Sequence, residues 1–363
     1  MLIVVGVGVT ADWGFGSGVA GSEKSISAQE PSSDVCLFLE GSYPFVVGGV
    51  SSWTHSLIRE HPELTFSIVS IQPRHSASKP RYDRPKNVIN TTLVEIPGEG
   101  ISGFPSVQSP EWLASTLEAL IVDGDVDAMS QLARLARDSN GRPGDPESAW
   151  PLVRNMYQRL APNTSFQQFF WIWSTLFGSL REVLASPLPK ARLYHTISTG
   201  YAGLLAARAK AETGAPMLLT EHGLYTHERF VELMSSDDLH DCFKYAPLHS
   251  SDRREGRDVW LEAFESMASI CYAQADKTIT LSEMGHKAQI ELGAAPDRAM
   301  FIPNGINVDR FSDIVPRRKA EPPRIGFIGR VVAIKDVETF IRASGLLVAD
   351  DPTLEAWIIG PTE

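Results

Sequence analysis

Two cations, Arg330 and Lys335, follow a short apolar segment at residues 324–328 that is typical of a buried strand. A helical pattern begins at Asp336, so the two side chains would lie beside a helix N-terminus, where backbone N–H groups favour anions. Such a pair suits the stabilisation of a phosphate group or of a departing diphosphate. Two solvated cations on the surface are the alternative interpretation of the same pattern.

Two histidines end other predicted strands. His222 lies in the segment Thr220-Glu221-His222-Gly223, directly after a strand predicted at residues 216–220. Open α/β sheets bind ligands outside the carboxyl ends of their strands, and a neutral imidazole there can hydrogen-bond a ligand hydroxyl. A histidine that caps the following helix is the structural alternative. His195 lies near the end of a strand predicted at residues 191–197, and a packed histidine is the favoured interpretation there.

A glycine pair follows the first predicted strand, residues 34–39. Gly48-Gly49 would let a loop backbone approach a ligand closely, which a Cβ atom would block, but a plain tight turn fits equally well. Glu40 and Tyr43 precede the pair in the same segment. Farther along the chain, Glu228-Arg229 follows His222 and is either part of a site or an exposed charge pair.

Strand and helix patterns alternate along the chain, which predicts an α/β fold with a parallel sheet covered by helices on both faces. The predicted strands are residues 34–39, 65–72, 191–197, 216–220, 277–281, 300–303, 324–328 and 354–359. One helix is predicted to begin near residue 51. The other predicted helices cover residues 111–122, 126–137, 166–184, 200–212, 224–234, 255–275, 283–292 and 336–349.

The domain organisation follows from changes in composition. Residues 1–33 are expected to be a flexible leader, residues 34–311 one complete α/β domain and the proline-rich stretch 312–323 a linker. Residues 324–363 hold only two strands and one helix, too few for a stable domain, so we expect them to be the start of a second one.

The leader contains a motif that resembles a dinucleotide site. Residues 16–21 match GxGxxG, but a polar run follows instead of the amphipathic helix that such a site requires. We interpret the match as chance, and an oxidoreductase hypothesis rests on it alone.

Composition narrows the functional class further. The chain has 33 Lys and Arg against 44 Asp and Glu, a net charge of −11, which argues against a general nucleic-acid binder. Three distant cysteines fit a reducing compartment and offer no metal pair. The apolar N-terminus lacks the basic start of a signal peptide, and no apolar stretch is long enough for a membrane helix. We therefore expect a cytoplasmic protein.

Four segments in order carry a family resemblance. They are residues 40–50, 220–223, 302–307 and 329–336. Together they resemble the family 4 glycosyltransferases of the GT-B fold, over about residues 34–363. The stretches EGSYPFVVGGVSSW, LLTEHGLYTHER and GRVVAIKDVETFIRA are most similar to the PelF-type glycosyltransferases of Pel exopolysaccharide synthesis.

The resemblance implies two facing Rossmann-like domains, here an N-terminal one with helical insertions and the first βαβ of a second. It implies retaining transfer of a hexose from a nucleotide sugar, with UDP-glucose as the expected donor, without a metal or cofactor. The expected partners are a glycan acceptor and inner-membrane polysaccharide synthase subunits, with association to the membrane through them. The implied site residues are His222 as catalytic group, Arg330, Lys335, Gly48 and Gly49 at the donor phosphates, and Glu40, Tyr43, Glu221, Glu228, Arg229 and His195 as acceptor or sugar contacts.

One feature of the family falls outside the sequence. Its second domain carries a Glu-x7-Glu segment that grips the donor, and no residue after Glu363 supplies it. We therefore expect a fragment that is inactive alone. A non-catalytic binding or assembly module of a polysaccharide synthase is the alternative hypothesis.

Overall fold

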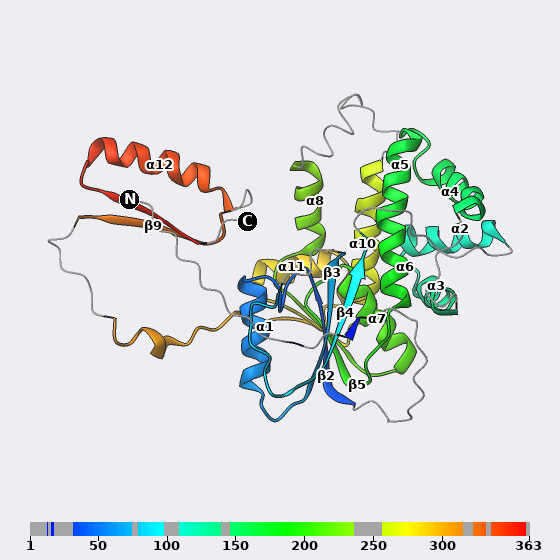
Figure 1. Cartoon of the computed structure of the whole chain (residues 1–363), viewed down its shortest axis with the longest axis horizontal. Coiled ribbons are helices and arrows are strands. Elements are labelled where there is room, and N and C mark those ends of the chain that lie inside the picture. The colour runs from blue at the N-terminus through cyan, green and yellow to red at the C-terminus, as the bar shows by residue number, and fades with distance from the viewer. Residues whose placement is uncertain are drawn as a thin grey trace. The chain divides into compact units, whose positions relative to one another are not determined.

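The computed structural model describes residues 13, 16–17, 32–74, 79–97, 109–138, 146–235, 256–314, 322–331 and 335–360. The chain divides into two compact units (Figure 1). One is Thr10–Asn304 and the other contains Gly305–Glu363, so the boundary precedes the linker expected at residues 312–323. Residues 315–321 of that linker lie outside the described residues.

The larger unit contains a parallel sheet whose strand order is β1-β4-β3-β2-β5-β6-β7-β8. The strands are β1 Gly16–Ser17, β2 Ser33–Glu40, β3 Phe66–Pro73, β4 Val88–Ile96, β5 Ala191–Thr196, β6 Met217–Glu221, β7 Lys277–Thr280 and β8 Ala299–Phe301. From β2 the chain moves outward through β3 and β4, then returns to the other side of β2 and continues from β5 to β8. This is the order of a doubly wound, Rossmann-like sheet, with its reversal between β2 and β5.

Helices cover both faces of this sheet. They are α1 Gly49–Glu60, α2 Pro110–Glu118, α3 Val126–Asp138, α4 Pro146–Leu160, α5 Phe166–Ile172, α6 Gly178–Ala185, α7 Tyr201–Thr213, α8 Tyr225–Ser235, α10 Gly256–Gln274 and α11 Glu283–Glu291. Alternate residues of β2 enter different cores: Cys36 and Phe38 join one, and Leu37 and Leu39 join the other. Figure 1 shows α1 on one side of the sheet and α6 and α7 on the other. The expected α/β fold with helical insertions is therefore confirmed.

The sequence prediction contains neither β4 nor α4. The strand β4, sequence VINTTLVEI, contains polar residues on half-buried positions and so lacks a continuous apolar run. The helix α4 contains Pro151, a residue that usually ends a helix. Two predicted helices are also more irregular than expected, since π-helical turns continue α2 at Ala119–Asp123 and join α5 to α6 at Trp173–Phe177.

Part of the expected leader is packed into the fold. Trp13 is 1% exposed, and its indole N–H donates a 2.7 Å hydrogen bond to the carbonyl of Tyr82. The strand β1 pairs in parallel with β4 through Gly16 and Ser17. The expectation of a flexible leader is thus wrong for these residues, because an isolated tryptophan in a glycine-rich segment gives no periodic signal. The rest of residues 1–31 lies outside the described residues.

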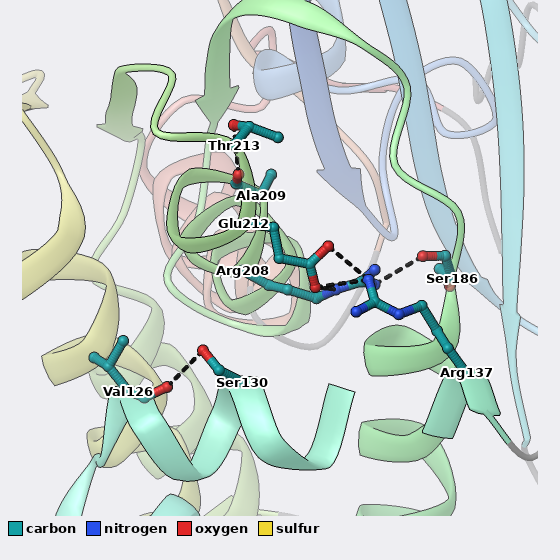
Figure 2. A network of polar contacts seen from close by, with 8 residues as sticks. All are labelled: Val126, Ser130, Arg137, Ser186, Arg208, Ala209, Glu212 and Thr213. Carbon is teal, nitrogen blue, oxygen red and sulfur yellow. Dashed lines mark hydrogen bonds and ion pairs between the residues drawn. The ribbon is translucent and has the colours of Figure 1, made fainter. Parts of the chain in front are cut away.

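A polar network fastens α7 at its C-terminal end (Figure 2). Arg208, which is 1% exposed, donates to Glu212 Oε1 at 2.8 Å and to the carbonyl of Ser186 at 2.7 Å. Arg137 of α3 donates to the same carboxylate at 2.5 Å. Burial alone would raise the pKa of Glu212, but the hydrogen bonds from Arg208 and Arg137 hold it below its ordinary value.

The smaller unit contains β9 Arg324–Ile328, α12 Val337–Asp350 and β10 Glu355–Ile359. The two strands pair in parallel from Arg324 to Ile328. The predicted βαβ unit is thereby confirmed.

Across the described part of the chain, no helix combines the length and apolar character needed to cross a membrane.

Candidate functional site

Chemistry-bearing residues gather where the strand order reverses. The parallel strands β2, β5 and β6 are neighbours in the sheet, so their carboxyl ends meet at one edge. Glu40 ends β2, Glu221 ends β6, and a turn at residues 197–200 follows β5. In doubly wound sheets this edge, at the reversal point, is where ligands bind.

Glu40 joins this edge to two helices. Its Oε1 accepts a 2.7 Å hydrogen bond from the hydroxyl of Tyr225 in α8, and its Oε2 accepts one of 3.2 Å from the backbone N–H of Ala202 in α7. Burial raises the pKa of Glu40, while the bonds from Tyr225 and Ala202 and the charge of Arg229 oppose that rise. Both carboxylate oxygens are therefore occupied by the protein itself.

The close packing around Glu40 depends on Gly200, which precedes α7. A Cβ atom at this position would lie 2.4 Å from Cζ of Tyr225 and 2.7 Å from Oε2 of Glu40. Only glycine leaves room for the tyrosine and the carboxylate to meet here.

His222 follows β6 and presents an unsatisfied nitrogen. Its Nε2 is buried and makes no hydrogen bond within the described part of the chain. The indole of Trp53 in α1 contacts the imidazole edge to face, with ring centroids 4.6 Å apart and an interplanar angle of 76°. Burial lowers the pKa of His222, so the ring is neutral at pH 7 and can donate or accept one hydrogen bond.

His195 is buried and packs against Trp53 and Thr220. It is 4% exposed, its Nε2 is 2.9 Å from Oγ1 of Thr220, and Trp53 contacts its ring at 6.1 Å. Burial, together with the nearby His222, lowers the pKa of His195 to about 4. The structure thus corrects the proposed sugar contact of His195 and agrees with the packed histidine favoured from the sequence.

Glu221 is also wrongly placed among the ligand contacts. It is 1% exposed, and its Oε2 accepts hydrogen bonds of 2.7 Å from Tyr272 of α10 and 2.7 Å from Gln289 of α11. Its Oε1 accepts a longer bond of 3.4 Å from Thr199. Burial raises the pKa of this carboxyl, while these donors and the backbone N–H of Tyr225 favour its charged form. With its oxygens so occupied, the side chain serves the protein interior.

Tyr43 is the third correction. It is fully buried, its hydroxyl is 3.0 Å from Nδ1 of His55, and its ring packs edge to face on Trp13 at 5.4 Å. Burial raises its pKa well above the ordinary value. A sugar cannot reach this hydroxyl, because the aromatic cluster of Tyr43, Trp13, His55 and Tyr82 encloses it.

Gly48 and Gly49 form the start of α1, directly after the β2 edge. Among the residues that the structure describes, a Cβ atom at either glycine would meet nothing within 4 Å, so their packing does not require glycine. The first turn of α1 contains no acidic residue, and no side chain of the described segments caps it. The N–H groups of a helix N-terminus suit an anion, and the donor-phosphate role of Gly48 and Gly49 stays a prediction.

Glu228 and Arg229 lie on the first turns of α8. The guanidinium of Arg229 lies 5.1 Å from the centre of the Tyr225 ring and pairs with Glu232 at 2.7 Å. Glu228 packs against Gly223, where an added Cβ would lie 2.0 Å from its Oε1. Arg229 therefore adjoins the Glu40–Tyr225 pair, and contact of Glu228 or Arg229 with a substrate stays a prediction.

Arg330 and Lys335 lie in the smaller unit, between β9 and α12. Lys335 is exposed and Arg330 half-buried, and Asp336 caps α12 by accepting from the N–H of Thr339 at 3.3 Å. Their role at a phosphate stays a prediction.

No group of three or more His, Cys, Asp or Glu residues is arranged to hold a metal ion within the described ranges.

The family assignment follows from sequence comparison. DUF3492, a domain of unknown function, matches residues 33–297, which comprise most of the chain and the whole β2–β5–β6 edge. The chain belongs to the DUF3492 family. No curated protein matches this DUF3492 chain in sequence.

Several solved structures share a loose likeness with the DUF3492 chain. Anabaena Alr3699/HepE in complex with UDP and glucose matches with a TM-score of 0.41 and 12% identity, over 91% of this chain and 62% of HepE. The lipopolysaccharide outer core galactosyltransferase WaaB in its apo form matches with a TM-score of 0.35 and 10% identity, over 90% and 68%. A glycotransferase of kitacinnamycin gives 0.35 and 10%, over 90% and 66%. The DUF3492 chain thus spans less than two thirds of the HepE chain.

Sequence reasoning missed several residues of the DUF3492 site edge. Trp53 lies in the stretch EGSYPFVVGGVSSW and Tyr225 in LLTEHGLYTHER. Neither is a candidate site residue from the sequence, because an aromatic residue is more often core than ligand contact. Gly200 had a usable signal, since it opens a helix directly after a predicted strand. Tyr272 and Gln289 gave none, because each is an ordinary helix residue whose partner is distant in sequence.

Proposed function

We propose that this DUF3492 chain contains the acceptor-side domain of a retaining glycosyltransferase. The enzyme transfers a hexose from a UDP-sugar, with UDP-glucose as the first candidate, to a growing Pel-like exopolysaccharide. The observation that carries the proposal is His222, a neutral imidazole with a buried, unpartnered Nε2 at the carboxyl edge where the strand order reverses. The motif resemblance to family 4 glycosyltransferases supports the choice of reaction.

The proposed roles follow from chemistry. His222 hydrogen-bonds a hydroxyl of the transferred sugar or of the acceptor through Nε2. The open N-terminus of α1 at Gly48 and Gly49 binds the diphosphate through backbone N–H groups. Arg330 and Lys335, in the smaller unit, supply positive charge to a diphosphate leaving group as it develops.

A glycan acceptor and inner-membrane synthase subunits complete the proposal. The enzyme acts at the cytoplasmic side of the membrane, where UDP-sugars are available, and associates with the membrane through those partners. The net charge of −11 argues against nucleic acid as its polymeric partner.

The test is UDP release from a panel of UDP-sugars, measured on the 363-residue chain and on the whole reading frame that contains it. A glycan acceptor should stimulate release, and NMR of the product should show the anomeric configuration of the donor. If neither protein releases UDP from any donor, the enzymatic proposal is wrong, and capture of synthase subunits would favour the assembly module instead.

A further inference from the structure

Glu221 precedes His222 and is the most completely enclosed carboxylate at the site edge. It is 1% exposed, and the distances to Tyr272 and Gln289 are both 2.7 Å. Thr199 and the backbone N–H of Tyr225 supply two further donors. One carboxylate thereby joins the turn after β5 and the start of α8 to the helices α10 and α11.

A buried carboxylate is costly at this position. Placing an ionised group in the interior is unfavourable unless hydrogen bonds replace its lost hydration. An apolar residue would fill the end of β6 at lower cost, as Leu219 does two positions earlier with 0% exposure. The donors around Glu221 are therefore arranged for an acceptor that has no hydrogen of its own.

The next residue in the sequence is His222, the proposed catalytic group. The indole of Trp53 contacts the ring of His222, and the Nε2 of His222 has no hydrogen-bond partner within the described residues. The Glu221 carboxylate fixes the backbone on both sides of His222. It belongs to the residue before His222, and it accepts from the backbone N–H of Tyr225, three residues after His222. Fixing this short turn fixes the direction of the imidazole.

We propose that Glu221 is the positioning residue for His222, which it orients by clamping the β6–α8 turn against Thr199, Tyr272 and Gln289. Glu221 does not touch the substrate. This role rests on the proposed function for its catalytic consequence, but the clamp itself is independent of any substrate. An amide in place of the carboxylate has the same shape but offers one accepting oxygen instead of two to the surrounding donors, so Glu221→Gln should weaken the clamp without removing volume.

The experiment compares Glu221→Gln with Glu212→Gln as a matched control. Glu212 is also a carboxylate bound by two side-chain donors, but it lies near the C-terminal end of α7, about 18 Å along the helix from Gly200. Both variants should lower the midpoint of urea unfolding. Only Glu221→Gln should affect His222.

Two readouts separate positioning from mere stability. In protein with carbon-13-labelled histidine, the His222 signal, assigned by its loss in His222→Gln, carries the ring-current shift of Trp53. That signal should move or broaden in Glu221→Gln and stay unchanged in Glu212→Gln. In UDP release, kcat of Glu221→Gln should fall roughly 10- to 100-fold, with the donor KM within about twofold of wild type.

An unchanged His222 signal in folded Glu221→Gln would overturn the proposal. If that variant does not fold, Thr199→Val and Gln289→Met each remove one donor, and an unmoved His222 signal in both would equally overturn it. If the wild-type protein releases no UDP, the proposed function fails, while the NMR comparison still decides whether Glu221 positions His222.

Discussion

The hydroxyl of Tyr225 donates a 2.7 Å hydrogen bond to Oε1 of Glu40, which ties the start of α8 to the carboxyl end of β2 across 185 residues of sequence. This bond stabilises a carboxylate whose pKa burial would otherwise raise further. The contact holds the start of α8 against the carboxyl end of β2.

Tyr225→Phe should lower the free energy of unfolding at pH 8 by about 2 kcal/mol, because a hydrogen bond to a charged group is lost. The pKa of Glu40 is already raised in the folded state, so stability falls as pH rises through that pKa, and the variant should show this more strongly. The loss should therefore be smaller at pH 4, where Glu40 is neutral.

Urea unfolding at both pH values measures this effect. Tyr157→Phe is the control, since its hydroxyl donates at 2.8 Å to the uncharged carbonyl of Thr164. If Tyr225→Phe lowers the free energy of unfolding equally at pH 4 and pH 8, the hydrogen bond from Tyr225 to a charged Glu40 does not account for the loss.

Replacement by alanine should lower stability at Gly200 and ligand binding at Gly49. Gly200→Ala should cost about 1–3 kcal/mol of stability, because its Cβ would overlap Tyr225 and Glu40. Gly49→Ala meets open space and should change stability by less than about 1 kcal/mol, yet weaken UDP-glucose binding if the α1 N-terminus holds the diphosphate. Thermal unfolding and calorimetric titration measure the two effects. Unaltered binding in Gly49→Ala would remove the phosphate role from that loop.

His195 should make the protein sensitive to acid. Its pKa is about 4 when folded against an ordinary 6.5, so the unfolded chain binds more protons between these values. The free energy of unfolding should accordingly fall by about 3 kcal/mol between pH 7 and pH 4 through this group alone. His195→Gln should lose that part of the pH dependence, whereas the exposed His61→Gln should keep it. Parallel pH curves for wild type and His195→Gln would show that the buried imidazole does not titrate in this way.

Trp13 should be required for stability although it lies in the expected leader. Trp13→Ala should lower the free energy of unfolding by about 3–5 kcal/mol, because a fully buried indole is removed. Trp13→Phe keeps a ring against Tyr43 but loses the hydrogen bond to Tyr82, so its loss should be smaller. Denaturation curves of both variants test this, and a wild-type curve for Trp13→Ala would place the residue outside the core.

The strands were largely predictable, because buried parallel strands are short apolar runs bounded by turn residues. The convergence of Glu40 and His222 at one edge followed, since each ends such a run. What failed was the assignment of roles to polar residues. Glu221 and Tyr43 are occupied by partners far away in sequence, and residue type alone cannot show whether a hydrogen-bonding group is already satisfied. Trp13 and β4 were missed because one side chain or a polar strand carries no periodic pattern.

The central claim is that His222 acts at the sugar in a UDP-sugar transferase. The most direct measurement is kcat/KM for UDP release from UDP-glucose by the whole reading frame, comparing His222→Ala with the exposed control His61→Ala. We predict a loss of roughly 100-fold for His222→Ala, as for removal of a group that stabilises the transition state, with His61→Ala equal to wild type. Equal kcat/KM in all three proteins would contradict the account.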